Sequence, residues 1–418
     1  MQAETHTQPP KSRRVLAYGS VPHDTGTFTF YRNLRAGLAP LGWEVRCVSV
    51  GAQTHRAWDA TFVDDGCVSL VPDEADRKRQ AQAFVAWCQE QNVDAVMPIN
   101  SVPILSALPH LPPEVRIVSR CANAFDHGYK ITMSAHERLA RIVATTPRHV
   151  RDLTERYGAD PDQIVLIPHG IDPTPFHQAL AHRQPTDVLR IAFLGRLEHN
   201  QKGVMFIPGI VRALAEQGVA FRLSIAGEGT HREEVEAAMD EQVAAGAVRF
   251  LGRLAPEDVP GYLAQHDAFL FPSRFEGFGF ALIEAMMAGC VPVASHLEGI
   301  TSFIIEDGVT GYLCEVGDQD AFAARFESLH RDRDTLASMQ RETAQHATKR
   351  FSHTRMAQDY AAVLDAVVGE PTHGLAAKSW QAFQVDPAFA QTWRRHVPPS
   401  LKRIVRRTLF RLKLSDRY

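Results

Sequence analysis

The segment FPSRFEGFGFALIEAMMAGCVPVAS, residues 271–295, decides the fold of this chain. A buried strand is predicted to end at Pro272, a glycine-rich loop follows, and a helix over 280–288 leads into a second strand, VPVAS. Strand, helix and parallel strand in succession are the repeating unit of an α/β sheet. Glycines before a helix also expose backbone N–H groups to which a phosphate can bind. A tight turn with a helix cap would leave the same pattern, so this motif alone does not decide the function.

The same alternation extends in both directions and predicts two α/β domains. Short runs such as VLAY and EVRCVSV alternate with helical patterns from Arg14 onwards, break at DPTPFHQALAHRQPTD, and restart at RIAFLG. We therefore predict two Rossmann-like domains that face each other across a cleft at the carboxyl ends of their sheets. The predicted parts are a disordered N-terminal tail (1–13), an N-terminal domain (14–172), an irregular linker (173–188), a C-terminal domain (189–350), a helix that packs back on the N-terminal domain (351–368) and an extension (369–418).

Composition excludes several classes of protein. The chain has 418 residues, is 45% hydrophobic and 22% charged, and carries a net charge of −3, which fits a globular protein and argues against a nucleic-acid-coating one. Its six cysteines are scattered without a CxxC pair, which favours a reducing cytoplasm over a disulfide framework. The start of the chain has no apolar stretch, and no segment reaches the roughly 18 consecutive apolar residues of a spanning helix. We therefore expect neither a signal peptide nor a membrane span.

Charged residues accompany the glycine-rich loop. Glu276 in the loop and Glu284, eight residues on, are suited to bind hydroxyl groups. Arg196 and Lys202 follow the strand RIAFLG and precede a helix, where two cations would neutralise a diphosphate. A ligand with phosphates in the middle and a polyol at each end fits this set, and a nucleotide sugar is such a ligand. Solvated cations on a loop remain the alternative for each cation taken singly.

Five motifs occur in order within residues 191–313: GRL-x4-KG, IAGEG, FLGRL, the segment quoted above, and DGVTGYL. In order and spacing this region resembles the C-terminal half of the family-4 glycosyltransferases of the GT-B fold. The segment IPHGID, 167–172, resembles the family's stretch just before the linker. The resemblance implies two Rossmann-like domains and a transfer of sugar from a nucleotide diphosphate donor with retention of anomeric configuration.

The resemblance also implies roles for individual residues. Arg196 and Lys202 would hold the diphosphate and stabilise it as a leaving group, and Glu276 would contact hydroxyls of the transferred sugar. These three are the expected catalytic residues. The residues expected to bind the donor are Gly26, Gly195, Arg253, Leu254, Gly277, Phe278, Gly279 and Glu284.

The N-terminal half resembles the family less closely. The turn after the first strand carries only Gly26 where the family often has two glycines. Where the family often has a histidine that faces the donor sugar, RIVSRCANAFDHG has Arg120, and His127 comes seven residues later. Either residue could contact the acceptor or the donor sugar, and His127 could equally be a surface or core histidine.

Three further patterns bear on cofactors and donor contacts. GEG at 227–229 lacks the third glycine of a dinucleotide fingerprint and is interpreted as a turn. DQD at 318–320 imitates a metal-binding motif, but it begins a helix, where capping is the better explanation. We therefore expect no cofactor and no metal requirement. In LEGITSFI, Thr301 and Ser302 stand where the family often has Pro-Glu, which leaves the local donor contacts open.

The chain ends in a basic amphipathic pattern. In residues 394–418, nine Lys or Arg residues accompany one acid, and apolar residues follow helical spacing. Such a helix can lie on an anionic membrane surface, which is our expectation for this tail. A helix packed on the enzyme with a solvated basic face is the alternative, and we expect no nucleic-acid partner.

These observations predict a retaining glycosyltransferase that moves a hexose from a nucleotide diphosphate sugar to a glycan or glycolipid acceptor. Cell-surface polysaccharide or lipopolysaccharide synthesis would suit a cytoplasmic enzyme that is peripheral at the inner face of the cell membrane. Another GT-B enzyme, such as a nucleotide-sugar epimerase, and a non-catalytic nucleotide-sugar-binding protein are the alternatives. The presence of Arg196, Lys202 and Glu276 argues against the non-catalytic protein.

Overall fold

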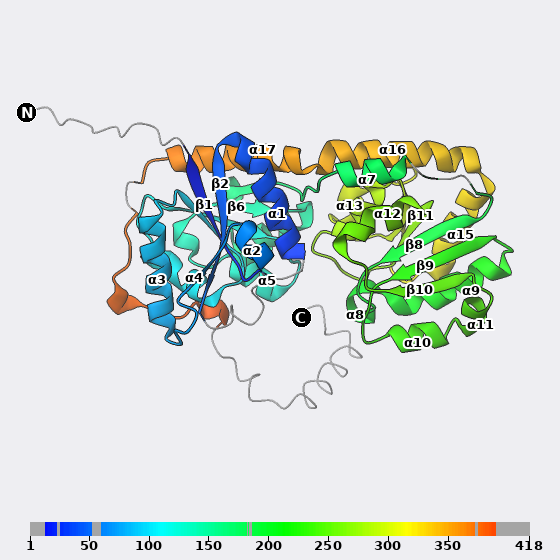
Figure 1. The fold of residues 1–418 in the computed structure, drawn as a ribbon, viewed down its shortest axis with the longest axis horizontal. Coiled ribbons are helices and arrows are strands. Elements are labelled where there is room, and N and C mark those ends of the chain that lie inside the picture. Colours follow the sequence, from blue (N-terminus) through cyan, green and yellow to red (C-terminus); the bar gives the residue numbers. More distant parts are fainter. Residues whose placement is uncertain are drawn as a thin grey trace, which may run out of the picture.

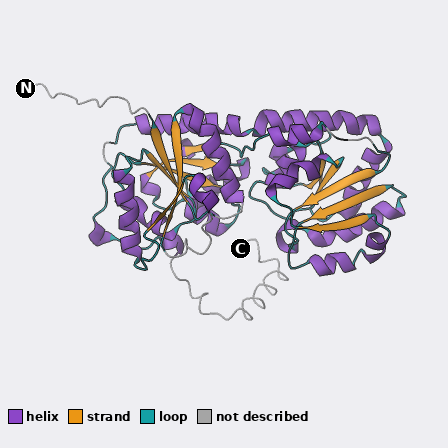
Figure 2. Cartoon of the chain, in the orientation of Figure 1, coloured by secondary structure: helices purple, strands orange, loops and turns teal. Residues whose placement is uncertain are grey.

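The computed structural model describes residues 13–22, 26–51, 60–181, 183, 186–372 and 375–389. In these residues the chain forms two domains, and two long helices run along one side of both (Figure 1). Each domain has a central parallel sheet covered by helices (Figure 2). The predicted pair of Rossmann-like domains is confirmed. Over the described ranges, no helix has the length and apolar character needed to cross a membrane.

The N-terminal domain has a seven-stranded sheet with the strand order β3-β2-β1-β4-β5-β6-β7. Its inner strands are continuous buried runs, such as AVMP in β4, because helices cover both faces of the sheet. The strands are β1 (Arg14–Gly19), β2 (Trp43–Val50), β3 (Cys67–Leu70), β4 (Ala95–Pro98), β5 (Arg116–Cys121), β6 (Leu139–Ala144) and β7 (Ile164–Leu166). The α-helices are α1 (Gly26–Leu38), α2 (Ala60–Asp64), α3 (Arg77–Glu90), α4 (Val102–Ala107), α5 (Asp126–Thr132) and α6 (Pro147–Tyr157).

The C-terminal domain has a six-stranded sheet with the order β10-β9-β8-β11-β12-β13. Its strands are β8 (Leu189–Leu194), β9 (Phe221–Ala226), β10 (Val248–Gly252), β11 (Ala268–Phe271), β12 (Val291–Ser295) and β13 (Tyr312–Cys314). Its helices are α7 (Thr174–Leu180), α8 (His199–Lys202), α9 (Ile207–Glu216), α10 (Arg232–Ala237), α11 (Asp240–Ala244), α12 (Val259–Ala264), α13 (Phe280–Met287), α14 (Thr301–Ile304), α15 (Gln319–Arg331) and α16 (Arg333–Phe351). β8 and β11 are neighbours, so the loops that follow them lie at one edge of the sheet.

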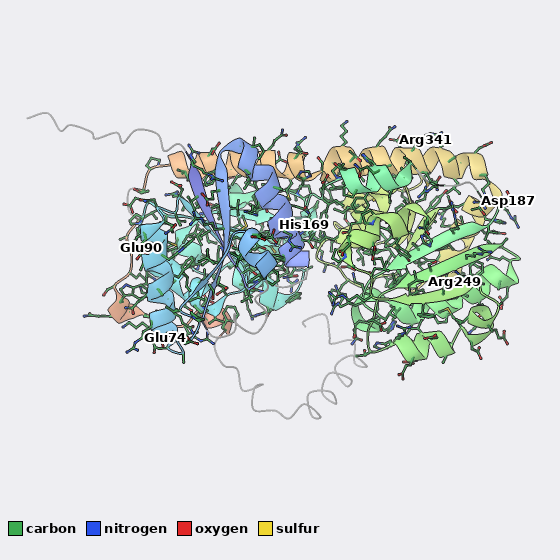
Figure 3. All side chains as sticks on the ribbon, in the orientation of Figure 1. Glu74, Glu90, His169, Asp187, Arg249 and Arg341 are labelled. Atoms are coloured by element: carbon green, nitrogen blue, oxygen red, sulfur yellow. The ribbon has the colours of Figure 1, made fainter. Side chains whose placement is uncertain are left out.

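The chain crosses between the domains twice, and the two crossings lie side by side. Ile171, on the way out of the N-terminal domain, forms a parallel bridge with Ser352, on the way back. Ser352 also caps α17 (His353–Gly369), which packs on α1, whereas α16 packs on α13. Figure 3 labels His169, just before the first crossing, on the side of the N-terminal domain that faces the C-terminal domain.

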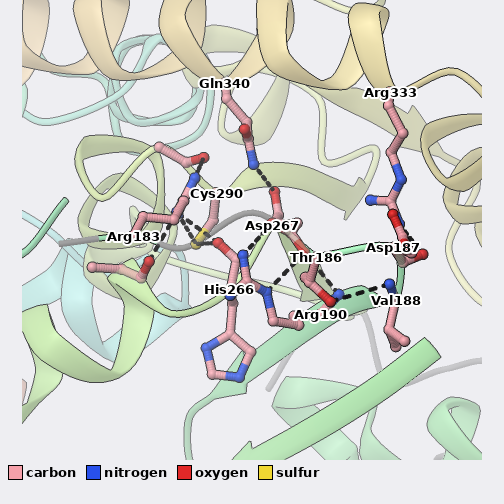
Figure 4. Close-up of polar contacts among 12 residues, drawn as sticks. Arg183, Thr186, Asp187, Val188, Arg190, His266, Asp267, Cys290, Arg333 and Gln340 are labelled. Atoms are coloured by element: carbon pink, nitrogen blue, oxygen red, sulfur yellow. Dashed lines mark hydrogen bonds and ion pairs between the residues drawn. The ribbon is translucent and has the colours of Figure 1, made fainter. Parts of the chain in front are cut away.

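The prediction of an irregular linker over 173–188 is wrong in its first half. Thr174–Leu180 forms α7, which packs on α12 and buries Phe176 in the core of the C-terminal domain. Arg183, after α7, binds this segment to the C-terminal domain. Its guanidinium donates to backbone oxygens at and after the ends of α12 and α13 (Figure 4). The acceptors are the carbonyls of Ala264, His266, Ala288 and Gly289. The last carbonyls of a helix have no partner within the helix, and Arg183 supplies one.

The described part of the C-terminal extension packs on the outer side of the N-terminal domain (Figure 1). Trp380 stacks on His110 with ring centroids 4.2 Å apart. Glu370, directly after α17, pairs with Arg116 of β5 at 3.0 Å. The predicted basic tail, 394–418, lies outside the described residues, as do residues 1–12 of the predicted N-terminal tail.

Candidate active site

The charged residues singled out from the sequence follow two neighbouring strands of the C-terminal sheet. Arg196 comes directly after β8 and Lys202 ends α8, while Glu276 lies in the loop after β11. Because β8 and β11 are adjacent and parallel, their carboxyl ends lie at the same edge. The topology of the sheet therefore brings together two segments that are distant in the sequence.

Lys202 and Glu276 form an ion pair at this edge. Lys202 Nζ lies 2.6 Å from Glu276 Oε1, and the hydroxyl of Ser273 donates to the same oxygen at 2.7 Å. Glu276 is 4% exposed, and a carboxylate buried to this degree is costly unless it is paired and hydrogen-bonded. Lys202 Nζ also lies 5.5 Å from the ring centroid of Phe271. The pair places a cation and an acceptor for hydroxyl groups within reach of one ligand.

Gln201 connects this pair to Arg196. Its Nε2 donates to Glu276 Oε2 at 3.4 Å, and its Oε1 accepts from the guanidinium of Arg196 at 2.5 Å. Arg196 itself is exposed, so its remaining donors can meet a ligand that approaches from solvent. Gln201 and Ser273 are site residues that were not predicted from the sequence. The signal that could have found them is their place inside the motifs that hold Lys202 and Glu276.

Two glycines let the loops at this edge pack closely. Gly203 has a φ of +66°, and a Cβ there would lie 2.0 Å from the carbonyl oxygen of Pro272. Gly227 has a φ of +141°, and a Cβ there would lie 1.8 Å from the carbonyl oxygen of Gly195. Gly227 belongs to the GEG pattern, so this pattern serves the close approach of two loops of the sheet edge. The close packing fixes the backbone that carries Arg196 and Lys202.

Glu284 lies in α13, one turn after the helix begins. Its side chain is half-buried, and desolvation raises the pKa of its carboxyl to about 7. Both protonation states are therefore populated near neutral pH. The ionised form only accepts hydrogen bonds, whereas the neutral form can also donate one. Such a group can bind paired hydroxyls, and its affinity for them depends on pH.

The loop between β11 and α13 also contacts the N-terminal domain. A Cβ on Gly277 would lie 2.1 Å from the carbonyl oxygen of Ala122, which follows β5. At a second contact, Gly26 at the start of α1 faces the ring of Phe280 at the start of α13. The structure therefore brings Gly26 and Gly277, both expected to bind the donor, to the junction of the two domains.

His169, in the IPHGID segment, lies at this junction and was missed by the sequence analysis. Its ring stacks on Phe280, with centroids 4.6 Å apart and planes 13° apart. It also meets the buried ring of Phe278 edge-on, with centroids 4.7 Å apart. Burial, and then the positive charge of Arg120, hold the pKa of His169 well below its usual range, so the ring is neutral. The motif marks this histidine, but no sequence pattern shows which rings it will meet.

Arg120, expected to contact the acceptor or the donor sugar, is packed inside the N-terminal domain. Its side chain is buried, and its guanidinium lies 2.8 Å from Nε2 of His169 and 3.7 Å over the ring centroid of Phe30. His127, the other candidate, is exposed on α5, and its ring meets that of Phe389 in the extension at 5.5 Å. The described contacts of Arg120 and His127 therefore do not include Lys202, Gln201 or Glu276.

The remaining donor-binding candidates lie at the carboxyl edge of the C-terminal sheet. The backbone N–H of Gly195 donates to the carbonyl of Ala226, and Gly279 is the N-cap residue of α13. Arg253 is exposed, and Leu254 is half-buried against the C-terminal core. Arg253 and Leu254 follow β10, which is an edge strand of the sheet.

The structure also explains the DQD pattern at 318–320 and the Thr301-Ser302 pair. The carboxylate of Asp318 accepts from the backbone N–H of Ala321 at 3.0 Å, which confirms that it caps α15. Thr301 Oγ1 accepts from the backbone N–H of Leu297 at 2.7 Å, and Ser302 Oγ accepts from that of Gly299 at 2.9 Å. Thr301 and Ser302 thus hold the turn before α14.

Two Rossmann-like domains, with an Arg, a Lys and a Glu at the carboxyl edge of the second sheet, define the class of GT-B glycosyltransferases. Residues 189–332 match the family model "Glycosyl transferases group 1". Glycogen synthase of Mycobacterium tuberculosis is 30% identical over 358 residues, which cover 84% of this chain and 79% of the relative. This chain belongs to the group 1 glycosyl transferases, and the resemblance to family 4 is confirmed.

Other relatives and solved structures agree with this assignment. The putative colanic acid biosynthesis glycosyltransferase WcaL of Salmonella typhimurium is 28% identical over 219 residues, or 50% of this chain and 53% of the relative. A glycosyltransferase from Rickettsia africae superposes with a TM-score of 0.71 at 15% identity, over 86% of this chain and 100% of that one. Anabaena HepE, solved with UDP and glucose, superposes with a TM-score of 0.66 at 16% identity, over 85% of this chain and 100% of that one. These structural likenesses concern the fold.

Proposed function

We propose that this chain is a retaining glycosyltransferase that transfers a hexose from a nucleotide diphosphate sugar to a glycan or glycolipid acceptor. The observation that carries the proposal is the Lys202–Glu276 ion pair, connected through Gln201 to Arg196, at the carboxyl edge of the C-terminal sheet. The names of the relatives support the substrate class, since they include a glycogen synthase and a colanic acid glycosyltransferase. HepE, solved with UDP and glucose, supports a nucleotide-sugar donor.

A bound donor would replace contacts that the site residues make with one another. A diphosphate would take Lys202 and Arg196 as partners, and Glu276, released from Lys202, would accept hydrogen bonds from hydroxyls of the sugar. The two cations would stabilise the negative charge that develops on the departing diphosphate. The loop before α13 would add backbone N–H groups at the start of that helix, and Glu284 would bind the ribose hydroxyls.

Catalysis in this proposal rests on positioning and on charge stabilisation by side chains. We propose no metal requirement, because Arg196 and Lys202 supply the positive charge that a metal would otherwise bring to a diphosphate. Retention of configuration would follow from attack by the acceptor on the same face from which the diphosphate leaves. The N-terminal domain would then present the acceptor from the other side of the junction.

The setting of the reaction is a further part of the proposal. A glycolipid or a growing surface polysaccharide would be met at the inner face of the cell membrane. Residues 394–418 would hold the enzyme there through their basic side chains, each contributing on the order of 1 kcal/mol near an anionic surface. Removal of residues 394–418 should weaken flotation with anionic liposomes at low salt, and unchanged flotation would exclude this role of the tail.

A thermal-shift panel tests the donor site. A ligand that binds the folded chain stabilises it by mass action, by about 2.7 kcal/mol at a hundredfold excess over its Kd. Among UDP-, GDP-, ADP- and dTDP-sugars, we expect one nucleotide to raise the melting temperature selectively. The Lys202→Ala variant should lose this shift, whereas the exposed control Lys349→Ala should keep it. If no nucleotide sugar shifts the melting temperature, the donor assignment is wrong.

A further inference from the structure

A cavity of about 650 Å³ lies on the N-terminal domain, away from the proposed donor site. Residues from the second half of α1, the first half of β2 and the start of β3 line it. The part of β2 that lines it precedes the residues that pair with β3, which run from Cys47 to Val50. Gly26 begins α1 at the domain junction, and Arg35 in the cavity wall is about 14 Å further along the helix. Small-molecule sites have volumes of roughly 300–1,000 Å³, so this cavity can hold a small ligand.

Four of the fourteen described residues that line this cavity are arginines, and we call it the arginine cavity. Its charged lining residues, among those that the structure describes, are Arg13, Arg32, Arg35, Arg46, Glu44 and Asp65. At one side, Arg32 Nε lies 2.7 Å from a carboxylate oxygen of Asp65, and a guanidinium nitrogen of Arg35 lies 4.0 Å from the other. One carboxylate therefore serves two guanidinium groups there.

A second set of charged residues in the arginine cavity repeats this arrangement. Arg46 Nε lies 2.6 Å from Glu44 Oε1, and Arg13 Nε lies 3.5 Å from Glu44 Oε2. Four guanidinium groups thus share two carboxylates, which leaves two positive charges in excess around one cavity that is open to solvent. Guanidinium groups bind phosphate oxygens through paired N–H donors. A dianionic phosphate group matches both the excess charge and the donors.

We propose that the arginine cavity binds a phosphate group, carried either by a small soluble compound or by a lipid headgroup. This site is separate from the donor site, and it uses other residues of another domain. All four arginine side chains are partly exposed, so a ligand can reach them and its binding weakens as salt screens the charges.

The geometry of the ion pairs suggests a variant that keeps the fold. Arg13 and Arg35 make the longer contacts, so the double variant Arg13→Gln/Arg35→Gln removes the excess charge and leaves the pairs at 2.6 and 2.7 Å intact. A matched control is Arg222→Gln/Arg249→Gln, which changes the net charge equally. Both control residues are exposed near the starts of β9 and β10, and Figure 3 labels Arg249 on the C-terminal domain.

Calorimetric titration of the full chain with inorganic phosphate at low salt tests the proposal. We expect the wild-type chain and the control to bind phosphate equally, Lys202→Ala to keep the binding that belongs to the arginine cavity, and Arg13→Gln/Arg35→Gln to lose it by at least tenfold. Lys202→Ala is included because the proposed donor site could also hold phosphate. Loss of binding in Lys202→Ala with full binding in Arg13→Gln/Arg35→Gln would overturn the proposal and leave the donor site in place.

A second arm distinguishes the source of the phosphate group. If inorganic phosphate does not bind, cosedimentation with vesicles of phosphatidylcholine and phosphatidic acid is compared between the wild-type chain and the same variants. Weaker cosedimentation of Arg13→Gln/Arg35→Gln alone assigns the cavity to a lipid headgroup. Equal behaviour of this variant and the wild type in both arms overturns the proposal.

Discussion

The carboxyl edges of the two sheets are built in the same way but carry different chemistry. After β8 and β11, glycine-rich loops bring Lys202 and Glu276 into one ion pair, with the exposed Arg196 joined to it through Gln201. At the edge of the N-terminal sheet, Arg120 is buried against Phe30 and His169. The same sheet architecture thus carries the proposed catalytic residues in one domain and helps to join the two domains in the other.

Glu276→Gln should have the largest effect on transfer. The amide keeps the shape of the side chain but removes the charge that pairs with Lys202, so both the sugar contact and the position of the lysine are lost. We expect kcat/KM to fall by at least about 10²-fold, the scale found when one preorganised electrostatic group is removed. Steady-state transfer with the donor selected by the thermal-shift panel measures it. The exposed residue Glu241 offers the control Glu241→Gln, which should transfer at the wild-type rate.

His169→Ala should act mainly on stability. The variant removes a buried ring between Phe280 and Phe278, and with it the imidazole that lies 2.8 Å from the guanidinium of Arg120. We expect the free energy of unfolding to fall by about 2 kcal/mol, and kcat/KM to fall by less than about tenfold. Urea denaturation and the transfer assay measure the two effects. A loss of transfer as large as that of Glu276→Gln would show that His169 takes part in the reaction. The two sheet edges would then not differ in function.

The donor KM should depend on pH through Glu284. Its pKa of about 7 means that the carboxylate, which accepts from ribose hydroxyls, is lost as the pH falls below neutrality. We expect the donor KM to rise by up to about tenfold from pH 8 to pH 6. Glu284→Gln should flatten this profile, and a profile that keeps its slope in the variant would assign the titration to another group.

The carboxyl of Glu284 should also make the stability of the fold depend on pH. The direction of this dependence is opposite to that of an acid held in an ion pair. Its pKa is raised from the usual value of 4.5, so the folded chain binds the proton more tightly than the unfolded chain does. Its contribution to stability is therefore present at low pH and is lost as the pH rises from about 4.5 through 7. Glu284→Gln should raise the melting temperature at pH 8 by at least about 2 °C and leave it nearly unchanged at pH 5.

His127→Ala should have the smallest effect. The side chain is exposed, and its described ring contact is with Phe389 of the extension. We expect kcat/KM to stay within about twofold of the wild type, as for most surface substitutions. A larger loss in the transfer assay, at unchanged stability, would show that the N-terminal edge takes part in the reaction through this residue.

Sequence patterns predicted the parts of the molecule that depend on local periodicity and chain order. Alternating strands and helices identified both domains, and the order of the motifs placed Arg196, Lys202 and Glu276 at one sheet edge. α7 was missed because its seven residues are too few to show a clear helical period among prolines and polar side chains. Gln201 was missed because its contact with Glu276 joins two distant segments, and His169 was missed because its ring partners come from distant segments. Their contacts arise only when the two sheets and the two domains have assembled.

Titration with the nucleoside diphosphate alone tests the separate roles of Lys202 and Glu276. Substitution of Lys202 should raise the Kd, whereas substitution of Glu276 should not. Lys202→Ala loses a cation for the diphosphate, so we expect its Kd to rise at least about tenfold. Glu276→Ala frees Lys202 from its partner, so its Kd for the same ligand should stay equal or fall, although this variant no longer transfers sugar. Equal weakening of nucleoside diphosphate binding by both variants would contradict the division of labour between Lys202 and Glu276.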